Sequence, residues 1–297
     1  MASLSEILRE KAESKQQRTL NNRAAREQLS QMRDASLTGI ASTPEAYAQY
    51  LVLQANNIGL SAGNIALALC QMKEPTKIGT TDFWHRQNRF VLDSEMQKGA
   101  AVFVPPRDRN FRGYLMGNYY DVSQTTGKPM KETVPLAEGS DRMNMAIASL
   151  LDAARVGFVE NTGLDAPARY NERECILEIN TEYGTGQVFA ALATEISYAR
   201  LHNRGMNRDY DRESVQFNAE SIGFMVCQRF GVECPLPDTD KVVETFGYYE
   251  SDDISKALDL MRDTAKNMGD TVDRSLQPRQ QEHTASRGSN NRQYGRR

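Results

Sequence analysis

Residues 191–202, ALATEISYARLH, hold the clearest chemical pattern in this chain. In zinc hydrolases, two histidines four residues apart on one helix face bind the ion. A glutamate directly after the first histidine takes a proton from the metal-bound water. Here Thr194 and Tyr198 stand at the histidine positions, and Glu195 stands where the proton acceptor would be.

A second predicted helix, 212–230, supplies Glu220 at the place where such sites draw a third ligand. The carboxylate of Glu220 suits a zinc ion, but the neutral hydroxyls of Thr194 and Tyr198 are weak ligands. Thr194, Glu195, Tyr198 and Glu220 therefore form the pattern of a metal site without its histidines. We predict no confident catalytic residue, no metal ligand and no cofactor, zinc included.

The histidines of the chain offer no replacement ligand. His202 lies two helical turns from Glu195, which is about 10.5 Å along the axis. His85 and His283 belong to other parts of the chain. His202 is instead expected to interact with the negative end of its helix.

Structural roles explain the same carboxylates without a metal. A glutamate on a partly buried helix needs a partner, so Glu195 is expected to pair with an arginine or to accept from a backbone group. Glu220 has the same need. The ring of Tyr198 would fill the space of a lost metal site, with its hydroxyl bonded to Glu220.

A second candidate site lies in residues 83–120, where aromatic and basic residues alternate. Single-stranded nucleic acid binds to flat side chains that stack with bases and to cations that follow the phosphates. Most aromatic residues in a small sheet belong to its core. For Trp84 too, the alternative to DNA binding is a buried position in the core. The predicted DNA-binding residues are Trp84, Arg86, Arg89, Lys98, Arg107, Arg109 and Arg112.

Charge is unevenly distributed along the 297 residues. Residues 1–33 hold seven Lys or Arg against four Asp or Glu, and residues 274–297 hold six Arg against one Glu, so the middle is acidic. Basic ends favour contact with nucleic acid or simply aid solubility. The sequence has no long apolar run, no secretory signal and no paired CxxC cysteines, which predicts a cytoplasmic protein with reduced core thiols and no membrane contact.

The pattern of elements predicts an α+β fold in two domains. Residues 1–37 form a basic helical extension followed by a short linker at 37–42. Residues 38–139 form a small α+β domain with strands at 100–105 and 114–122, and residues 140–272 form a mainly helical domain. Residues 273–297 have too few apolar side chains to fold alone and are predicted to be disordered.

The order of these segments over roughly 40–272 resembles the ArdC-type antirestriction proteins of mobile elements. The shared phrases are FWHRQNRFV, EMQKGAAVFVP, YYDVSQTTG, CILEIN, FAALATEISYARLH and AESIGFMVCQRFGV. The resemblance implies an N-terminal domain that binds single-stranded DNA and a C-terminal zincin-like domain. It places Thr194 and Tyr198 at the zinc histidines, Glu195 at the catalytic glutamate and Glu220 at the third ligand.

These observations lead to one function and two alternatives. The expected function is DNA binding, to single strands, in a mobile element or antirestriction system, with a degenerate peptidase domain that is not an enzyme. One alternative is a residual zincin-type metallohydrolase that uses Glu195 and Glu220. The other is a scaffold whose zincin-like domain holds a protein partner and which has no role with DNA.

Overall fold

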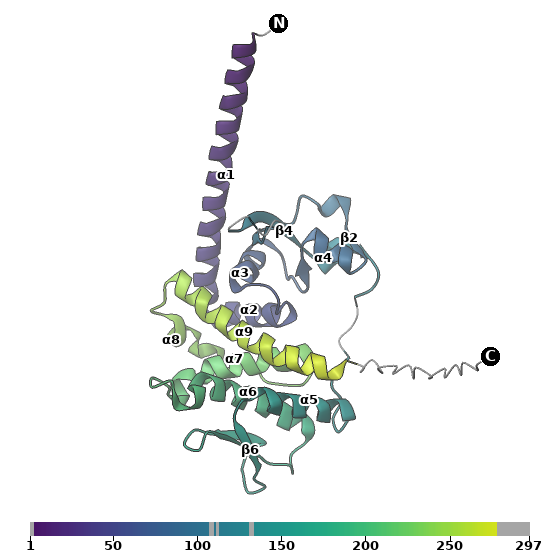
Figure 1. Ribbon diagram of the computed structural model, residues 1–297, viewed down its shortest axis with the longest axis vertical. Helices are drawn as coiled ribbons and strands as arrows, with labels where there is room; N and C mark the ends of the chain where they lie inside the picture. Colours follow the sequence, from purple (N-terminus) through teal and green to yellow (C-terminus); the bar gives the residue numbers. More distant parts are fainter. Residues whose placement is uncertain (1–2, 107–109, 111–112, 131–133, 278–297) are drawn as a thin grey trace, which may run out of the picture.

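Helices make up most of the fold, and three small sheets lie at its two ends (Figure 1). The computed structural model describes residues 3–106, 110, 113–130 and 134–277. The helices are α1 (Leu4–Ile40), α2 (Pro44–Asn56), α3 (Ala62–Gln71), α4 (Thr81–Arg86), α5 (Asp141–Ala153), α6 (Thr185–His202), α7 (Arg212–Phe230), α8 (Val242–Phe246) and α9 (Ser251–Leu276). The predicted α+β class is confirmed.

The strands form two small sheets in the first half of the chain and one in the second. They are β1 (Ile78–Gly79), β2 (Arg89–Val91), β3 (Ala100–Val104), β4 (Leu115–Asp121), β5 (Thr125–Gly127), β6 (Gly157–Glu160), β7 (Ala168–Asn171) and β8 (Ile176–Ile179). The first sheet has the antiparallel order β1–β4–β3, and β2 pairs with β5. In the third sheet, with the order β6–β8–β7, β6 runs parallel to β8 and β7 runs antiparallel to it.

Capping residues in the sequence set several helix ends. Thr43 accepts a hydrogen bond from Ala46 N at 3.2 Å ahead of Pro44, the first residue of α2. Ser140 caps α5 in the same way. α7 ends at Gly231, whose φ of 63° lies in the left-handed region that favours glycine.

α1 is a single rod that projects from the body, and only its last part touches the core (Figure 1). A capping box between Ser3 and Glu6 starts it. The predicted linker at 37–42 is wrong, because Leu37 and Ile40 are buried and hold the chain in the helix through Ile40. Burial of these apolar side chains therefore extends α1 beyond its predicted end at residue 37.

One hydrophobic core joins the two halves of the chain. Its buried residues run from Leu29 on α1 to Val272 on α9. Leu136 and Met143, on either side of the predicted boundary at 139, both belong to it. The division into domains at 139 remains a prediction.

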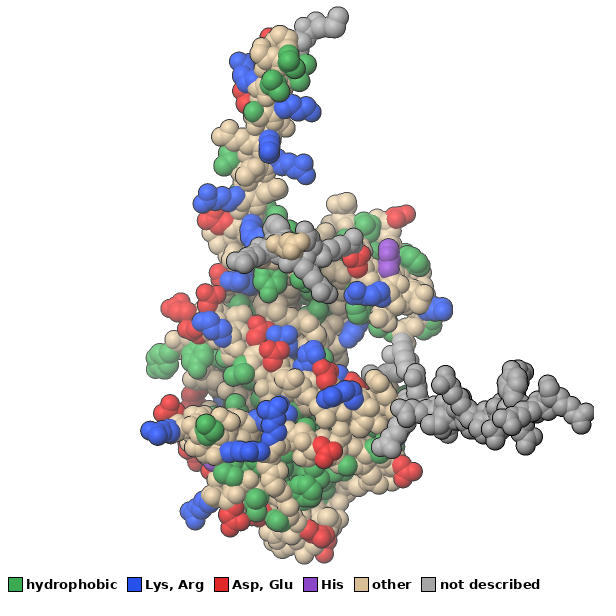
Figure 2. All heavy atoms as spheres, in the orientation of Figure 1, with side chains coloured by type: hydrophobic (Ala, Val, Ile, Leu, Met, Phe, Trp, Pro, Cys, Tyr) green, Lys and Arg blue, Asp and Glu red, His purple; other side chains and the backbone are tan. Residues whose placement is uncertain are grey.

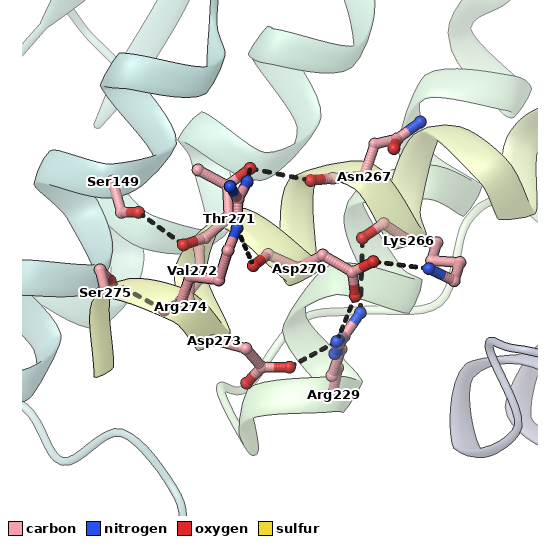
Figure 3. A network of polar contacts seen from close by, with 10 residues as sticks. All are labelled: Ser149, Arg229, Lys266, Asn267, Asp270, Thr271, Val272, Asp273, Arg274 and Ser275. Carbon is pink, nitrogen blue, oxygen red and sulfur yellow. Dashed lines mark hydrogen bonds and ion pairs between the residues drawn. The ribbon is translucent and has the colours of Figure 1, made fainter. Parts of the chain in front are cut away.

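α9 packs along α5 and α7 and is fixed to them by polar contacts (Figure 3). The Arg229 guanidinium on α7 contacts Asp270, at 2.7 Å, and Asp273. Ser149 on α5 donates to Thr271 O at 3.1 Å. α9 continues to Leu276, so the predicted disordered tail begins too early, and its remainder at 278–297 lies outside the described residues.

The cysteines carry no disulfide. Cys227 is buried as predicted, but Cys70 is exposed, so the prediction that all four thiols lie in the core is wrong. Among the described residues, no helix is long and apolar enough to cross a membrane.

Candidate functional site

Glu195 lies on the buried face of α6, and both of its carboxylate oxygens accept hydrogen bonds. Oε2 accepts from the backbone N–H of Tyr170 on β7 at 2.7 Å. Oε1 accepts from Arg212 Nη2 on α7 at 2.7 Å. Only 9% of the Glu195 surface is exposed, so these two partners replace the water that a carboxylate otherwise needs. Both structural roles predicted for Glu195 are thus present.

Arg212 lies between Glu195 and Tyr198. Its guanidinium carbon stands 3.8 Å from the centre of the Tyr198 ring, at the distance of a cation–π contact. Burial would lower the pKa of Arg212, but the hydrogen bond and charge of Glu195, together with Tyr198 and Tyr210, outweigh burial and raise that pKa, which keeps the guanidinium charged. Burial raises the pKa of the Tyr198 hydroxyl to about 12, although the charge of Arg212 opposes the rise.

A further polar cluster continues from Arg212 to the end of α6. Arg212 Nη1 lies 3.7 Å from Glu172 Oε1, which accepts from the Tyr210 hydroxyl at 3.0 Å. The Tyr210 ring lies 4.4 Å from the His202 ring, and His202 Nδ1 bonds the Tyr170 hydroxyl at 2.8 Å. His202 therefore joins α6 to β7.

Thr194 and Glu220 have partners of their own. Thr194 lies at a close approach of α6 to α7: a Cβ at Gly223 would stand 2.2 Å from Thr194 Oγ1. Glu220 Oε1 accepts from Gln216 Nε2 at 2.6 Å, and Gln216 Oε1 accepts from Lys241. The predicted bond between Tyr198 and Glu220 is replaced by the contact of Tyr198 with Arg212.

The residues at this place do not fit a metal ion. Within the part of the chain that the structure describes, no group of three His, Cys, Asp or Glu side chains could hold one. The positive charge of Arg212 at Glu195 also repels a cation. Each oxygen of Glu195 already accepts one hydrogen bond from the protein, which fixes the carboxylate between β7 and α7.

Arg212 is the residue of this site that sequence reasoning missed. It stands four and eight residues before Gln216 and Glu220, so the three side chains share one face of α7. An arginine on the same helix face as the half-buried Glu220 was the available signal.

The predicted DNA-binding residues separate into distinct groups. The Trp84 ring is fully buried and its Nε1 donates to Tyr120 O at 3.0 Å, so it is not available to stack with a base. Arg89 donates to Thr125 Oγ1 at 2.8 Å and to Lys128 O at 2.6 Å, which joins β2 to β5. Both residues therefore stabilise the fold: Trp84 through its buried ring, and Arg89 through the hydrogen bonds that its guanidinium donates.

The remaining predicted cations lie at the surface. Lys98 is exposed and pairs with Glu95 at 2.8 Å. Arg86 is exposed, and no ion pair within the described residues involves it. Arg107, Arg109 and Arg112 lie outside the described residues.

Two adjoining hollows, which we call the aromatic groove, lie between α1, α3, α4 and the ends of β3 and β4. Their volumes are about 300 and 500 Å³, and both are lined by Ser61, Asn64, Phe103 and Tyr114. The smaller hollow adds Arg26 and Arg33 from α1, and the larger adds Lys77, Phe83, Arg86 and Arg262. Sequence reasoning missed the part played by Arg26, because nothing local shows that α1 passes beside β3.

Comparison with known proteins gives limited similarity. No family model matches the chain, and no curated protein matches its sequence. Two solved structures of the antirestriction ArdC protein from plasmid R388, one metal-free and one Mn(II)-bound, are each 16% identical to the chain and cover 71% of it. The alignments span 85% and 87% of those proteins, with TM-scores of 0.45 and 0.44. Scores of this size carry no transfer of residue roles, so the sites rest on the contacts above.

Proposed function

We propose that this protein binds single-stranded DNA in the aromatic groove, and that α6 and α7 serve as a structural pair without peptidase activity. The observation that carries the proposal is the meeting of the exposed Tyr114 and the half-buried Phe103 with cations in one groove. Arg26 and Tyr114, from segments far apart in the sequence, form its centre.

The aromatic side chains supply surfaces for stacking. Tyr114 is 57% exposed, and the half-buried Phe103 lines both hollows. Base stacking on an aromatic ring contributes about 1–3 kcal/mol per base and tolerates any base. This chemistry suits a single strand, whose bases are free to turn toward the protein.

Phe103 is held in place before any ligand arrives. Asn64 on α3 accepts from Phe103 N at 3.1 Å and donates to Phe103 O at 2.7 Å. The backbone of β3 is therefore clamped to α3 at the floor of the groove. A fixed ring loses little conformational entropy when a base stacks on it.

Cations lie on both sides of these rings. The Arg26 guanidinium donates to Tyr114 O at 2.6 Å and stands 5.5 Å from the Phe103 ring centre. Arg86 lines the other end of the groove, and basic side chains continue along α1 (Figure 2). Cations beside stacking rings are the combination that binds the phosphates and bases of a single strand.

The size of the groove agrees with this ligand. The larger hollow, about 500 Å³, falls within the roughly 300–1,000 Å³ of small-molecule sites. It has room for a single nucleotide, whose base must be unstacked from any duplex before it can enter. Single-stranded DNA is therefore the favoured ligand.

A binding measurement with the full-length chain tests the proposal. Fluorescence anisotropy of a labelled oligothymidine should show binding near physiological salt, and the same label on a duplex should bind more weakly. Replacing Arg26 and Arg86 by Gln should weaken binding and flatten its salt dependence by about 0.7 per lost phosphate contact.

Arg173→Gln is the matched control, because Arg173 is exposed in the turn between β7 and β8 and lines neither hollow of the groove. The proposal fails if the oligothymidine does not bind, or if the Arg26 and Arg86 variants bind as the control does.

We place this activity in the cytoplasm, in opposition to restriction of incoming DNA, on the resemblance of the sequence phrases quoted above. Transfer of an unmodified plasmid into cells with an active restriction system should rise when the protein is present. Loss of that protection in the groove variants, and its retention in Arg173→Gln, would link the two activities.

A further inference from the structure

The two edges of the sheet β6–β8–β7 differ in their availability. On β7, the outward N–H of Tyr170 is already bonded to Glu195. On β6, all four residues are exposed, and no other described strand pairs with its outer side. An exposed edge of this kind is a template for one more strand.

The hydrogen-bond register identifies which groups of β6 face outward. Asn161 N, directly after β6, donates to Ile179 O of β8 at 2.8 Å. Because N–H groups alternate sides along a strand, those of Phe158 and Glu160 point away from β8. These backbone groups are placed to pair with an added strand.

An apolar pocket of about 330 Å³ opens beside the same strand. Its apolar walls include Leu151 of α5, Phe158, Ile179 and Val188. Phe158 is 55% exposed at its rim. A pocket of this lining takes an aliphatic or aromatic side chain.

The surroundings of the pocket are acidic. Residues 157–188 hold six Asp or Glu against two Arg, and Glu160 lines the pocket itself. Figure 2 shows hydrophobic side chains gathered on this lower part of the molecule with acidic ones around them. A ligand with Lys or Arg beside its apolar residue would complement this charge.

We propose that β6 and this pocket bind an extended segment of a partner protein, which adds a strand to the sheet. An apolar side chain of that segment fills the pocket, and basic residues flank it. Backbone pairing along β6 gives affinity and the pocket gives selectivity, as in other cases of strand addition. This surface is separate from the aromatic groove, so the inference does not depend on DNA binding.

Selection of randomised octapeptides displayed on phage, with the immobilised full-length protein as target, tests the proposal. The enriched sequences should share one large apolar residue with Lys or Arg nearby. No enrichment, or enrichment of acidic sequences, would overturn it.

Two variants of one residue test strand pairing for an enriched peptide. Glu160→Pro removes an outward N–H without touching the bonds to β8, and proline is tolerated at such edge positions. Glu160→Ala removes the same carboxylate and keeps the N–H. We expect Glu160→Pro to bind roughly tenfold more weakly than Glu160→Ala, the effect of one lost hydrogen bond. Equal binding by the two variants would contradict strand addition.

A measurement on the peptide keeps the test independent of folding in the variants. Two versions of the peptide, N-methylated at its odd or at its even residues, should differ: one should no longer bind, because its N–H groups toward β6 are lost, and the other should still bind. If neither register matters, the proposal is wrong. A concentration-dependent dimer that Glu160→Pro dissociates would assign the edge to a second copy of this chain and also refute it.

Discussion

The Arg212 guanidinium donates to Glu195 Oε1 at 2.7 Å and lies over the ring of Tyr198, which stands at the second histidine position of the zinc-site pattern. A fixed positive charge therefore lies beside the carboxylate, where the sequence pattern would have placed a metal. The ion pair links α6 to α7, and Glu195 links both to β7.

Arg212→Met should destabilise the protein by about 3 kcal/mol, because it leaves the Glu195 charge buried with a single hydrogen bond. Urea unfolding at neutral pH measures this change. Glu195→Gln should cost less, since the amide oxygen still accepts from Tyr170 N.

The double variant supplies the control for that prediction. If the two side chains form one interaction, Glu195→Gln with Arg212→Met should cost less than the sum of the single changes. Additive costs would show that Arg212 stabilises the fold through other contacts, such as Tyr198 and Glu172.

Zinc should leave the thermal unfolding of the protein unchanged, and so should a chelator. A ligand that binds only the native state raises the free energy of unfolding by an amount that grows with the logarithm of its concentration over its dissociation constant. The residues around Glu195 do not fit a metal, so no such increase is expected. Stoichiometric zinc in the purified protein, lost on Glu220→Ala, would favour the metallohydrolase alternative instead.

Restoring histidine at the first ligand position should not restore a site. Thr194→His places a ring where α6 and α7 meet at Gly223, and overpacking of this kind costs roughly 1–3 kcal/mol. Tyr198→His, which replaces a buried ring by a smaller one, is the comparison. Zinc-dependent stabilisation of the double variant, Thr194→His with Tyr198→His, would contradict this account of the packing.

The sequence predicts well where local signals decide the structure. β3 and β4 lie within one residue of their predicted starts and ends, and Thr43, Ser140 and Gly231 are local capping signals at helix ends. These features depend on residues close together in the chain, so a single sequence contains their cause.

Long-range contacts account for what the sequence did not predict. The four-residue strands β6 and β7 are too short for a clear pattern and depend on pairing with β8. Arg26 reaches Tyr114 across 88 positions of sequence, and Arg212 reaches Glu195 from another helix. For Trp84, composition alone does not separate a stacking ring from a buried one.

Asp121 provides a pH-dependent test of the structure beside the aromatic groove. Burial would raise the pKa of its carboxyl, but hydrogen bonds from Ser123, Thr76 N and Lys77 N outweigh burial and lower that pKa. A lowered pKa in the folded state gives stability that is present at neutral pH and lost as the pH falls through that pKa.

Asp121→Asn should therefore cost roughly 1–3 kcal/mol at neutral pH, and the difference from the unchanged protein should shrink below about pH 4. Urea unfolding over this pH range measures both. Asp165→Asn, at an exposed ion pair, should cost less than about 0.5 kcal/mol. A cost for Asp121→Asn that does not vary with pH would exclude a role for the carboxylate charge.

Trp84 is the single tryptophan of the chain, so its fluorescence reports on one position. Because the ring is fully buried, its emission should be blue-shifted and iodide should quench it little. Saturating oligothymidine should leave that quenching unchanged. Strong protection from iodide on DNA binding would mean that the ring is exposed in the free protein and covered by a base.

Tyr114 is expected to contribute the largest single share of DNA affinity. Tyr114→Leu removes the exposed ring at the centre of the aromatic groove and keeps the backbone oxygen that accepts from Arg26. Loss of one stacking contact corresponds to roughly five- to 150-fold weaker binding. The salt dependence should stay the same, because no phosphate contact is removed.

Tyr248→Leu is the matched control, since Tyr248 is 99% exposed and lies outside the groove. Equal binding by both variants would remove stacking from the proposed mechanism, whereas a changed salt slope for Tyr114→Leu would show that the substitution displaces Arg26.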